Sequence, residues 1–269
     1  MKIALIQMKV QKDNDSNIQI ACGRISEAAK AGADLVMLPE MFCCPYETVN
    51  FPVYAQPDGG VNWQALSECA KENRVYLVAG SMPERESEAI YNTSYVYNRC
   101  GEQIAKHRKM HLFDVDIKDG QRFCESETLT AGSKVTVFDT EFGRMGLMIC
   151  FDIRFPELAR LMALHGAKAI LVPAAFNLTT GPVHWELNFR SRAVDNQVFL
   201  LGCSPARDMG GSYHAYGHSI VVSPWGRVLA QLDETEGILY CDLDLDETEE
   251  IREQLPLLKA RRTDVYTLF

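Results

Sequence analysis

The chain has 269 residues and a formal net charge of −9, and 47% of its residues are hydrophobic and 23% are charged. This composition is typical of a globular protein with a large core, and it excludes disordered and fibrous classes. The negative charge disfavours nucleic-acid partners, which are bound through clustered Lys and Arg. No apolar run approaches the ~18 residues of a membrane span, and no secretory signal is readable. We therefore expect a cytoplasmic protein that binds no membrane.

Strand-like apolar stretches alternate with amphipathic segments along the chain. The pattern first predicts a strand over 2–8, then a helix over 15–30 and a second strand over 34–38. This order is typical of an open sheet covered by helices. Further strands are expected over 75–79, 91–98, 103–107, 135–139, 145–149, 169–172, 198–203, 218–222, 228–232 and 238–242. Further helices are expected over 63–73, 156–165 and 184–196. Because no repeat or linker marks a boundary, we expect one α/β domain over 1–269 with two sheets between helical layers.

The cysteines predict free thiols, and one of them is placed as a nucleophile. Nine cysteines without a C-x-x-C pair favour reduced thiols over a disulfide framework. Cys150 ends an apolar strand, and a helix opens nearby at Pro156, so the thiol is expected at the strand's carboxyl end, where open sheets bind ligands. A helix N-terminus or a nearby cation would lower its pKa and favour the thiolate. The alternative is an inert buried thiol.

Two charged residues follow other predicted strands. Glu40 comes directly after the apolar run 35–38 and Pro39. A partly desolvated carboxyl there suits a general base, because desolvation raises its pKa toward neutrality. Lys109 lies just beyond the strand that ends near His107, where an ammonium could stabilise an oxyanion. The alternative for Glu40 is a surface Glu at the start of a loop. For Lys109 taken alone, a solvated basic loop is the preferred interpretation.

Together, these segments resemble the three catalytic motifs of the nitrilase (carbon-nitrogen hydrolase) superfamily. The motifs are LPE over 38–40, KHRKMHLF over 106–113 and GLMICFDIRFPE over 146–157, in this order. Further segments resemble the omega-amidase branch: 42–46, 91–93, 111–116, 123–128, 173–182, 184–186, 204–207 and 257–266. The sequence departs from similar proteins at Cys43-Cys44, where polar or small residues are frequent, and at Phe151, which is commonly Tyr or Trp. The resemblance implies a four-layer αββα sandwich with two mixed sheets between helical layers.

The resemblance also implies an amidohydrolase with a Glu-Lys-Cys triad. Cys150 would attack the amide carbon, and Glu40 would transfer the proton. Lys109 and the backbone N–H of Phe151 would hold the oxyanion. Glu125 matches the family's second glutamate and would orient Lys109 or the attacking water, although a surface acid in the acidic run 125–127 is the alternative. Omega-amidases hydrolyse monoamides of 2-oxo dicarboxylic acids, such as 2-oxoglutaramate and 2-oxosuccinamate, to the keto acid and ammonia.

Such a substrate requires a group that binds its distant carboxylate. Arg154, four residues after the nucleophile, is placed for this role because a guanidinium matches carboxylate geometry. The alternative is a structural ion pair with Asp152 or Glu157. Three further positions match residues that line the pocket in similar proteins, with turn or packing roles as the alternative: Tyr46, Asn177 and Thr180.

Three other functions stay open. Another amidase of the superfamily would act on an N-carbamoyl compound, deaminated glutathione or an aliphatic amide. A metallohydrolase would use a histidine pair four residues apart, His107 and His111 or His214 and His218, but neither pair has the His-Glu-x-x-His form. The third is a catalytically silent scaffold. We expect no metal, no cofactor, a small-molecule amide substrate and, by resemblance, a homodimer or larger homo-oligomer.

Overall fold

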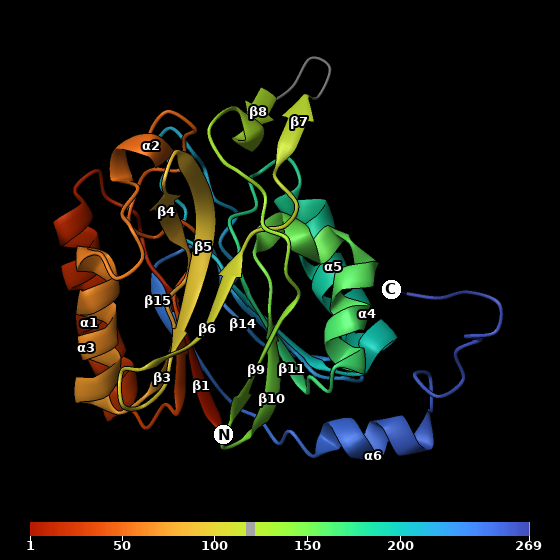
Figure 1. Ribbon diagram of the computed structural model, residues 1–269. Helices are drawn as coiled ribbons and strands as arrows, with labels where there is room; N and C mark the ends of the chain where they lie inside the picture. The colour runs from red at the N-terminus through yellow and green to blue at the C-terminus, as the bar shows by residue number, and fades with distance from the viewer. Residues whose placement is uncertain (117–121, 269) are drawn as a thin grey trace.

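Two β-sheets lie face to face between two layers of helices (Figure 1). The computed structural model describes residues 1–116 and 122–268. Helices α1 (Asn14–Lys30) and α3 (Val61–Asn73) cover the outer face of the first sheet, and α4 (Pro156–Leu164) and α5 (Gly181–Asn196) cover that of the second. The predicted four-layer αββα sandwich is confirmed.

The first sheet has the order β15-β1-β2-β3-β5-β4, with β6 also paired to β5. Its strands are β1 (Lys2–Gln7), β2 (Leu35–Met37), β3 (Tyr76–Val78), β4 (Met82–Glu86), β5 (Ala89–Tyr97), β6 (Gln103–Arg108) and β15 (Gly237–Asp242). The strands β1, β2 and β3 are mutually parallel, whereas β15, β4, β5 and β6 pair antiparallel to their neighbours. The sheet is therefore mixed.

The second sheet has the order β14-β13-β12-β11-β10-β9 and is also mixed, with β10, β11 and β12 parallel. Its strands are β9 (Thr136–Thr140), β10 (Gly143–Leu147), β11 (Ala169–Pro173), β12 (Phe199–Cys203), β13 (Ile220–Val222) and β14 (Val228–Gln231). Outside the sheets, β7 (Asp114–Asp116) pairs with β8 (Arg122–Cys124). The short helices are α2 (Phe51–Tyr54), η1 (Glu125–Glu127), η2 (Cys150–Arg154) and α6 (Glu247–Gln254).

Side-chain alternation along the strands builds the layers. In β1, Ile3 and Leu5 pack between the two sheets, while Ala4 and Ile6 pack in the layer under α1 and α3. A period of two places successive side chains on opposite faces, so a strand buried on both faces reads as one apolar run. On the other side, Trp185 from α5 is buried in the layer beneath α4 and α5.

The predicted strands and helices are found close to their predicted bounds, but α2, β4, β7, β8 and α6 were not predicted. Strand β4 reads Met-Pro-Glu-Arg-Glu and carries no apolar alternation. It lies at the edge of its sheet, where a proline is tolerated because one side of the strand has no neighbouring strand to bond. Its buried Glu84 is satisfied by Thr93, Lys106 and Arg108.

Helix α5 starts three residues before its predicted start, at Gly181 rather than His184. The run 179–182 reads as a turn, yet Pro182 occupies the first turn of the helix, where its missing N–H costs nothing.

The nine cysteines are all free thiols. Among the described residues, no helix has both the length and the apolar character that crossing a membrane requires.

Candidate active site

The three predicted catalytic residues follow three different strands. Glu40 comes shortly after β2, Lys109 directly follows β6, and Cys150 opens η2 after β10. Glu40 and Lys109 are fully buried, and Cys150 is 5% exposed. Because β2 and β6 belong to the first sheet and β10 to the second, the two sheets together bring these side chains to one place.

The backbone is constrained beside both Glu40 and Cys150. Met41 has φ 50° and Cys150 has φ 46°, a left-handed conformation that costs a non-glycine residue about 1–3 kcal/mol. The turn at Glu40 packs against Gly80, whose Cβ, if it had one, would lie 2.1 Å from the Pro39 carbonyl oxygen. Glycine is therefore required at position 80 for the chain to hold Glu40 in this place.

Lys109 bridges two buried carboxylates. Its Nζ lies 2.9 Å from Glu40 Oε1 and 2.9 Å from Glu125 Oε1. The Tyr46 hydroxyl donates to Glu125 Oε1 at 2.7 Å and to Glu40 Oε1 at 3.2 Å. Asn92 Nδ2 also donates to Glu40 Oε1, at 2.9 Å. Three side chains, those of Lys109, Tyr46 and Asn92, thus fix the orientation of the Glu40 carboxylate.

The alternative that Glu40, Lys109 and Glu125 are solvated surface residues is wrong. Glu40, Lys109 and Glu125 are each fully buried. The second carboxylate oxygen of Glu125 accepts the backbone N–H of Phe113 at 2.7 Å, so both of its oxygens have partners. Glu125 contacts Lys109 directly, in agreement with its predicted orienting position.

The pKa values of Glu40 and Lys109 are both raised, but for different reasons. Burial, followed by the charge of Glu125, raises the pKa of Glu40, and Lys109 only partly opposes this. Burial alone would lower the pKa of Lys109, but the charges of Glu125 and Glu40 outweigh it and raise that pKa. Lys109 therefore stays an ammonium at neutral pH, and Glu40 acquires the raised pKa that suits a general base.

The expected lowering of the Cys150 pKa is wrong. Burial and the charge of Glu40 raise the pKa of this thiol well above its usual range, although Lys109 and the Ala175 backbone N–H act in the opposite direction. The thiol is therefore protonated at rest and needs a base. Within the described part of the chain, Glu40 Oε2 has no hydrogen-bond partner, so this oxygen is open to receive the proton.

Asp152 ties the Lys109 segment to the Cys150 turn. Its Oδ2 accepts the Ile149 backbone N–H at 3.0 Å and lies 3.0 Å from His107 Nε2. Its Oδ1 accepts the His111 backbone N–H at 2.9 Å and lies 2.7 Å from His111 Nδ1. Burial alone would raise the pKa of Asp152, but the bonds from His107 and His111 hold it well below its usual range.

We expect Asp152→Asn to weaken both the fold and catalysis. The amide keeps the shape but places an NH2 group among donors, so at least one buried N–H loses its acceptor, at a cost of about 1–3 kcal/mol in the free energy of unfolding. Denaturant titration measures that loss, and kcat should fall because Lys109 and Cys150 lose their link. Asp139→Asn, at an exposed ion pair with Arg144, is the control. Equal stability of the two variants contradicts the prediction.

The histidine pairs do not form a metal centre in the described part of the chain. His107 and His111 both contact the carboxylate of Asp152. His214 and His218 lie against the backbone carbonyls of Gly211 and Tyr216. No cluster of three or more His, Cys, Asp or Glu suited to a metal occurs among residues 1–116 and 122–268.

Arg154 lies in the cavity of Cys150 and is not part of an ion pair. Its Nη1 is 3.0 Å from His184 Nδ1, and its guanidinium carbon lies 4.8 Å from the centre of the Phe176 ring. Neither Asp152 nor Glu157 pairs with it, so the structural ion pair is wrong for the described residues. Burial lowers its pKa, which shows that this cation is desolvated without a nearby carboxylate to compensate.

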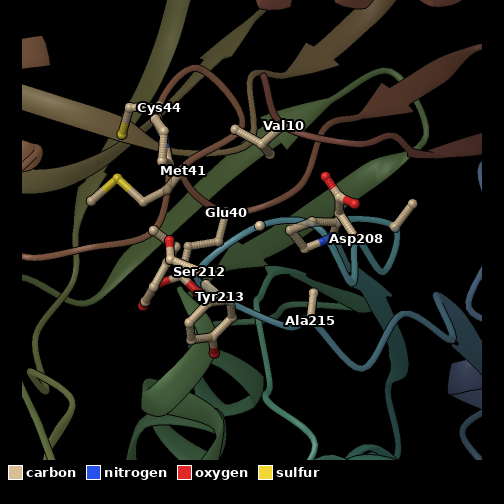
Figure 2. Close-up of a pocket in the computed structure, with 13 residues that line it drawn as sticks. Val10, Glu40, Met41, Cys44, Asp208, Ser212, Tyr213 and Ala215 are labelled. Carbon is tan, nitrogen blue, oxygen red and sulfur yellow. The ribbon is translucent and has the colours of Figure 1, made fainter. Parts of the chain in front are cut away.

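The other predicted binding residues also lie at the site. Phe151 lines the Cys150 cavity together with Asn177 and Thr180. The Asn177 Oδ1 accepts the backbone N–H groups of Thr179 and Thr180. Asn177 and Thr180 therefore also stabilise a turn, which was the alternative to a binding role. Tyr46 lines a second cavity, together with Glu40. Figure 2 shows this cavity with Glu40 labelled.

Sequence reasoning missed Tyr213 and gave no role to Asn92. Tyr213 lines both cavities, and its hydroxyl donates to the Ala175 carbonyl. Figure 2 shows Tyr213 in the cavity at Glu40. It stands in a loop without periodicity, so no local pattern indicates it. Asn92 lies in the segment 91–93, which had only suggested the omega-amidase branch.

The two cavities are small. The one at Cys150 has a volume of about 10 Å³ and the one at Glu40 about 60 Å³. The first of these holds about one water molecule. Tyr213 lines both cavities and so lies between them and any larger substrate.

Comparisons with known proteins agree with this geometry. Residues 2–253 match the carbon-nitrogen hydrolase family. Mouse omega-amidase NIT2 is 49% identical over 267 residues, which cover 99% of this chain and 97% of that protein. Saccharomyces cerevisiae Nit3, a member of branch 10 of the nitrilase superfamily, superposes with a TM-score of 0.89 at 45% identity, over 97% of this chain and 96% of that one.

A more distant structure bears on the cysteine. A glutamate-to-leucine variant of the amidase from Nesterenkonia sp. AN1 carries the acetamide moiety of fluoroacetamide on its active-site cysteine. It is 27% identical to this chain with a TM-score of 0.82, over 98% of this chain and 95% of that one. With the matches above, these findings establish that the chain belongs to the carbon-nitrogen hydrolase family of the nitrilase superfamily.

Proposed function

We propose that this protein is an omega-amidase, which hydrolyses the terminal amide of 2-oxo dicarboxylic acid monoamides such as 2-oxoglutaramate and 2-oxosuccinamate. The observation that carries this proposal is the guanidinium of Arg154, which lies beside Cys150 without a carboxylate partner among the described residues. The similarity to omega-amidases over nearly the whole chain supports it.

The proposed reaction proceeds through a thioester. Glu40 Oε2 takes the proton of the Cys150 thiol, and the sulfur attacks the amide carbon. The Lys109 ammonium and the Phe151 backbone N–H stabilise the resulting oxyanion. Protonated Glu40 then gives its proton to the leaving nitrogen, which departs as ammonia and leaves the acyl group on Cys150.

The second half of the reaction uses the same carboxylate. Glu40 takes a proton from a water molecule, whose oxygen attacks the thioester carbon. Collapse of this second intermediate releases the keto acid, and the thiolate recovers its proton from Glu40. Glu125 positions Lys109 throughout, because its Oε1 lies 2.9 Å from the Lys109 Nζ.

Arg154 selects the substrate in this proposal. A half-buried guanidinium without a carboxylate partner among the described residues favours a ligand that brings a negative charge, and its fork can donate two hydrogen bonds to a carboxylate. The same cation would repel a cationic substrate such as N-carbamoylputrescine. Among the alternatives, a silent scaffold gains no support from a lysine buried between two carboxylates, since such charges are costly to bury.

The test compares a charged and a neutral substrate. We expect Arg154→Ala to lower kcat/KM for 2-oxoglutaramate roughly 10- to 100-fold, the value of a hydrogen bond to a charged group, and to change the hydrolysis of butyramide far less. Arg190→Ala, on the exposed side of α5, is the control. If Arg154→Ala leaves the preference for 2-oxoglutaramate unchanged, the assignment of Arg154 to the substrate carboxylate is wrong. If the wild type shows no preference for 2-oxoglutaramate over butyramide, the proposed function is wrong.

A further inference from the structure

We propose that His184 is a positioning residue, which holds the Arg154 guanidinium in the orientation that binds the substrate carboxylate. This inference rests on the proposed function and adds a specificity-determining contact to it. His184 lies in the first turn of α5, and Arg154 ends η2. The contact therefore joins the nucleophile's own turn to the helix that covers the second sheet.

The chemistry of the contact fixes the state of His184. The Arg154 Nη1 and the His184 Nδ1 are 3.0 Å apart. Because a guanidinium only donates hydrogen bonds, the Nδ1 must be the acceptor. The imidazole is therefore neutral and carries its hydrogen on Nε2. It accepts a hydrogen bond from Nη1, one of the two terminal nitrogens of the guanidinium.

Two rings restrict the remaining freedom of the guanidinium. Its carbon lies 4.8 Å from the centre of the Phe176 ring and 5.6 Å from that of Phe151. These contacts limit movement of the cation across the cavity, whereas His184 contributes the directed hydrogen bond. The buried Arg154 Nε has no hydrogen-bond partner within the described residues, so no other side chain there competes with His184 for the orientation of the guanidinium through this nitrogen.

The backbone of η2 is held from the same helix. Arg192 Nε donates to the Ile153 carbonyl at 2.9 Å, and its Nη2 donates to the Arg154 carbonyl at 3.1 Å. Both His184 and Arg192 belong to α5. With the Arg154 backbone anchored by Arg192, loss of His184 frees the side chain alone. That separation makes the role of His184 testable.

The test uses two variants and two substrates with the full chain. His184→Ala removes the acceptor, whereas His184→Asn places an amide oxygen near the position of Nδ1. We expect His184→Ala to lower the ratio of kcat/KM between 2-oxoglutaramate and butyramide by about tenfold, mainly through a higher KM for 2-oxoglutaramate. His184→Asn should restore most of that ratio. His165→Ala, at the exposed end of α4, is the control.

The outcomes separate the two proposals. An equal loss on both substrates, or no recovery in His184→Asn, overturns the positioning role and indicates a structural one. If Arg154→Ala abolishes the preference while His184→Ala retains it, only the role of His184 fails. If Arg154→Ala itself retains the preference, the roles of Arg154 and His184 both fail. If the wild type shows no preference for 2-oxoglutaramate, the proposed function fails.

Discussion

Replacing Lys109 with methionine should lower kcat at least about 10³-fold, because the variant loses the proposed oxyanion donor. It also loses the cation that lies 2.9 Å from both Glu40 and Glu125. Without that charge, the carboxylates repel each other, and the pKa of Glu40 rises further. The base would then be protonated when the thiol needs it.

The measurement is steady-state ammonia release, together with circular dichroism to establish that the variant is folded. Breaking a buried ion pair costs about 3–5 kcal/mol, so a folding check is necessary. Lys106→Met is the matched control, because Lys106 lies on β6, the strand that Lys109 directly follows, but its side chain is 23% exposed and pairs with Asp58 and Glu84. A folded Lys109→Met protein with kcat within tenfold of the wild type would contradict the assigned role.

Replacing Glu40 with glutamine should lower kcat about 10²- to 10⁴-fold, the contribution of a positioned general base. Glutamine retains an acceptor oxygen for Tyr46, Asn92 and Lys109, so the fold should be little affected. It cannot take the proton of Cys150, whose pKa lies well above its usual range. The loss should therefore fall on kcat more than on KM.

The pH profile provides the second readout for Glu40. A general base works only when it is deprotonated, so activity is lost as the pH falls through the pKa of Glu40. Because burial raises that pKa above its ordinary value of 4.5, the acid limb of kcat/KM should lie above pH 4.5. Glu86→Gln, at an exposed carboxylate paired with Arg108, should keep this limb. An acid limb below pH 4.5 in the wild type would contradict the assignment.

The strand pattern made Glu40, Lys109 and Cys150 candidate catalytic residues, because each follows a predicted strand. Apolar runs before Glu40 and Cys150 place both residues at strand ends, where open sheets bind ligands, although the two strands belong to different sheets. Lys109 follows β6 in the same way. Local pattern and motif order were therefore sufficient to identify the three residues.

The electrostatics of the site were less accessible from the sequence. The strand and the following turn suggested a lowered pKa for Cys150, yet burial raises it. That burial comes from segments distant in the sequence, such as the two that carry Ala175 and Tyr213. The position of a thiol in the chain does not show how much water surrounds it.

Contacts between motifs were also hidden. Asp152 appeared only as a candidate partner of Arg154, whereas it contacts His107 from β6 and His111 from the loop that follows β6. The contact between His184 and Arg154 joins residues 30 positions apart. Such pairs depend on how η2 and α5 pack, which periodicity does not specify.

The most direct test of the central claim is ammonia release from 2-oxoglutaramate, 2-oxosuccinamate, N-carbamoylputrescine and butyramide, by the wild type and by Cys150→Ala. We predict a preference for the two keto-acid amides that Cys150→Ala abolishes. A preference for either of the other two amides, or release that persists in Cys150→Ala, would contradict the account.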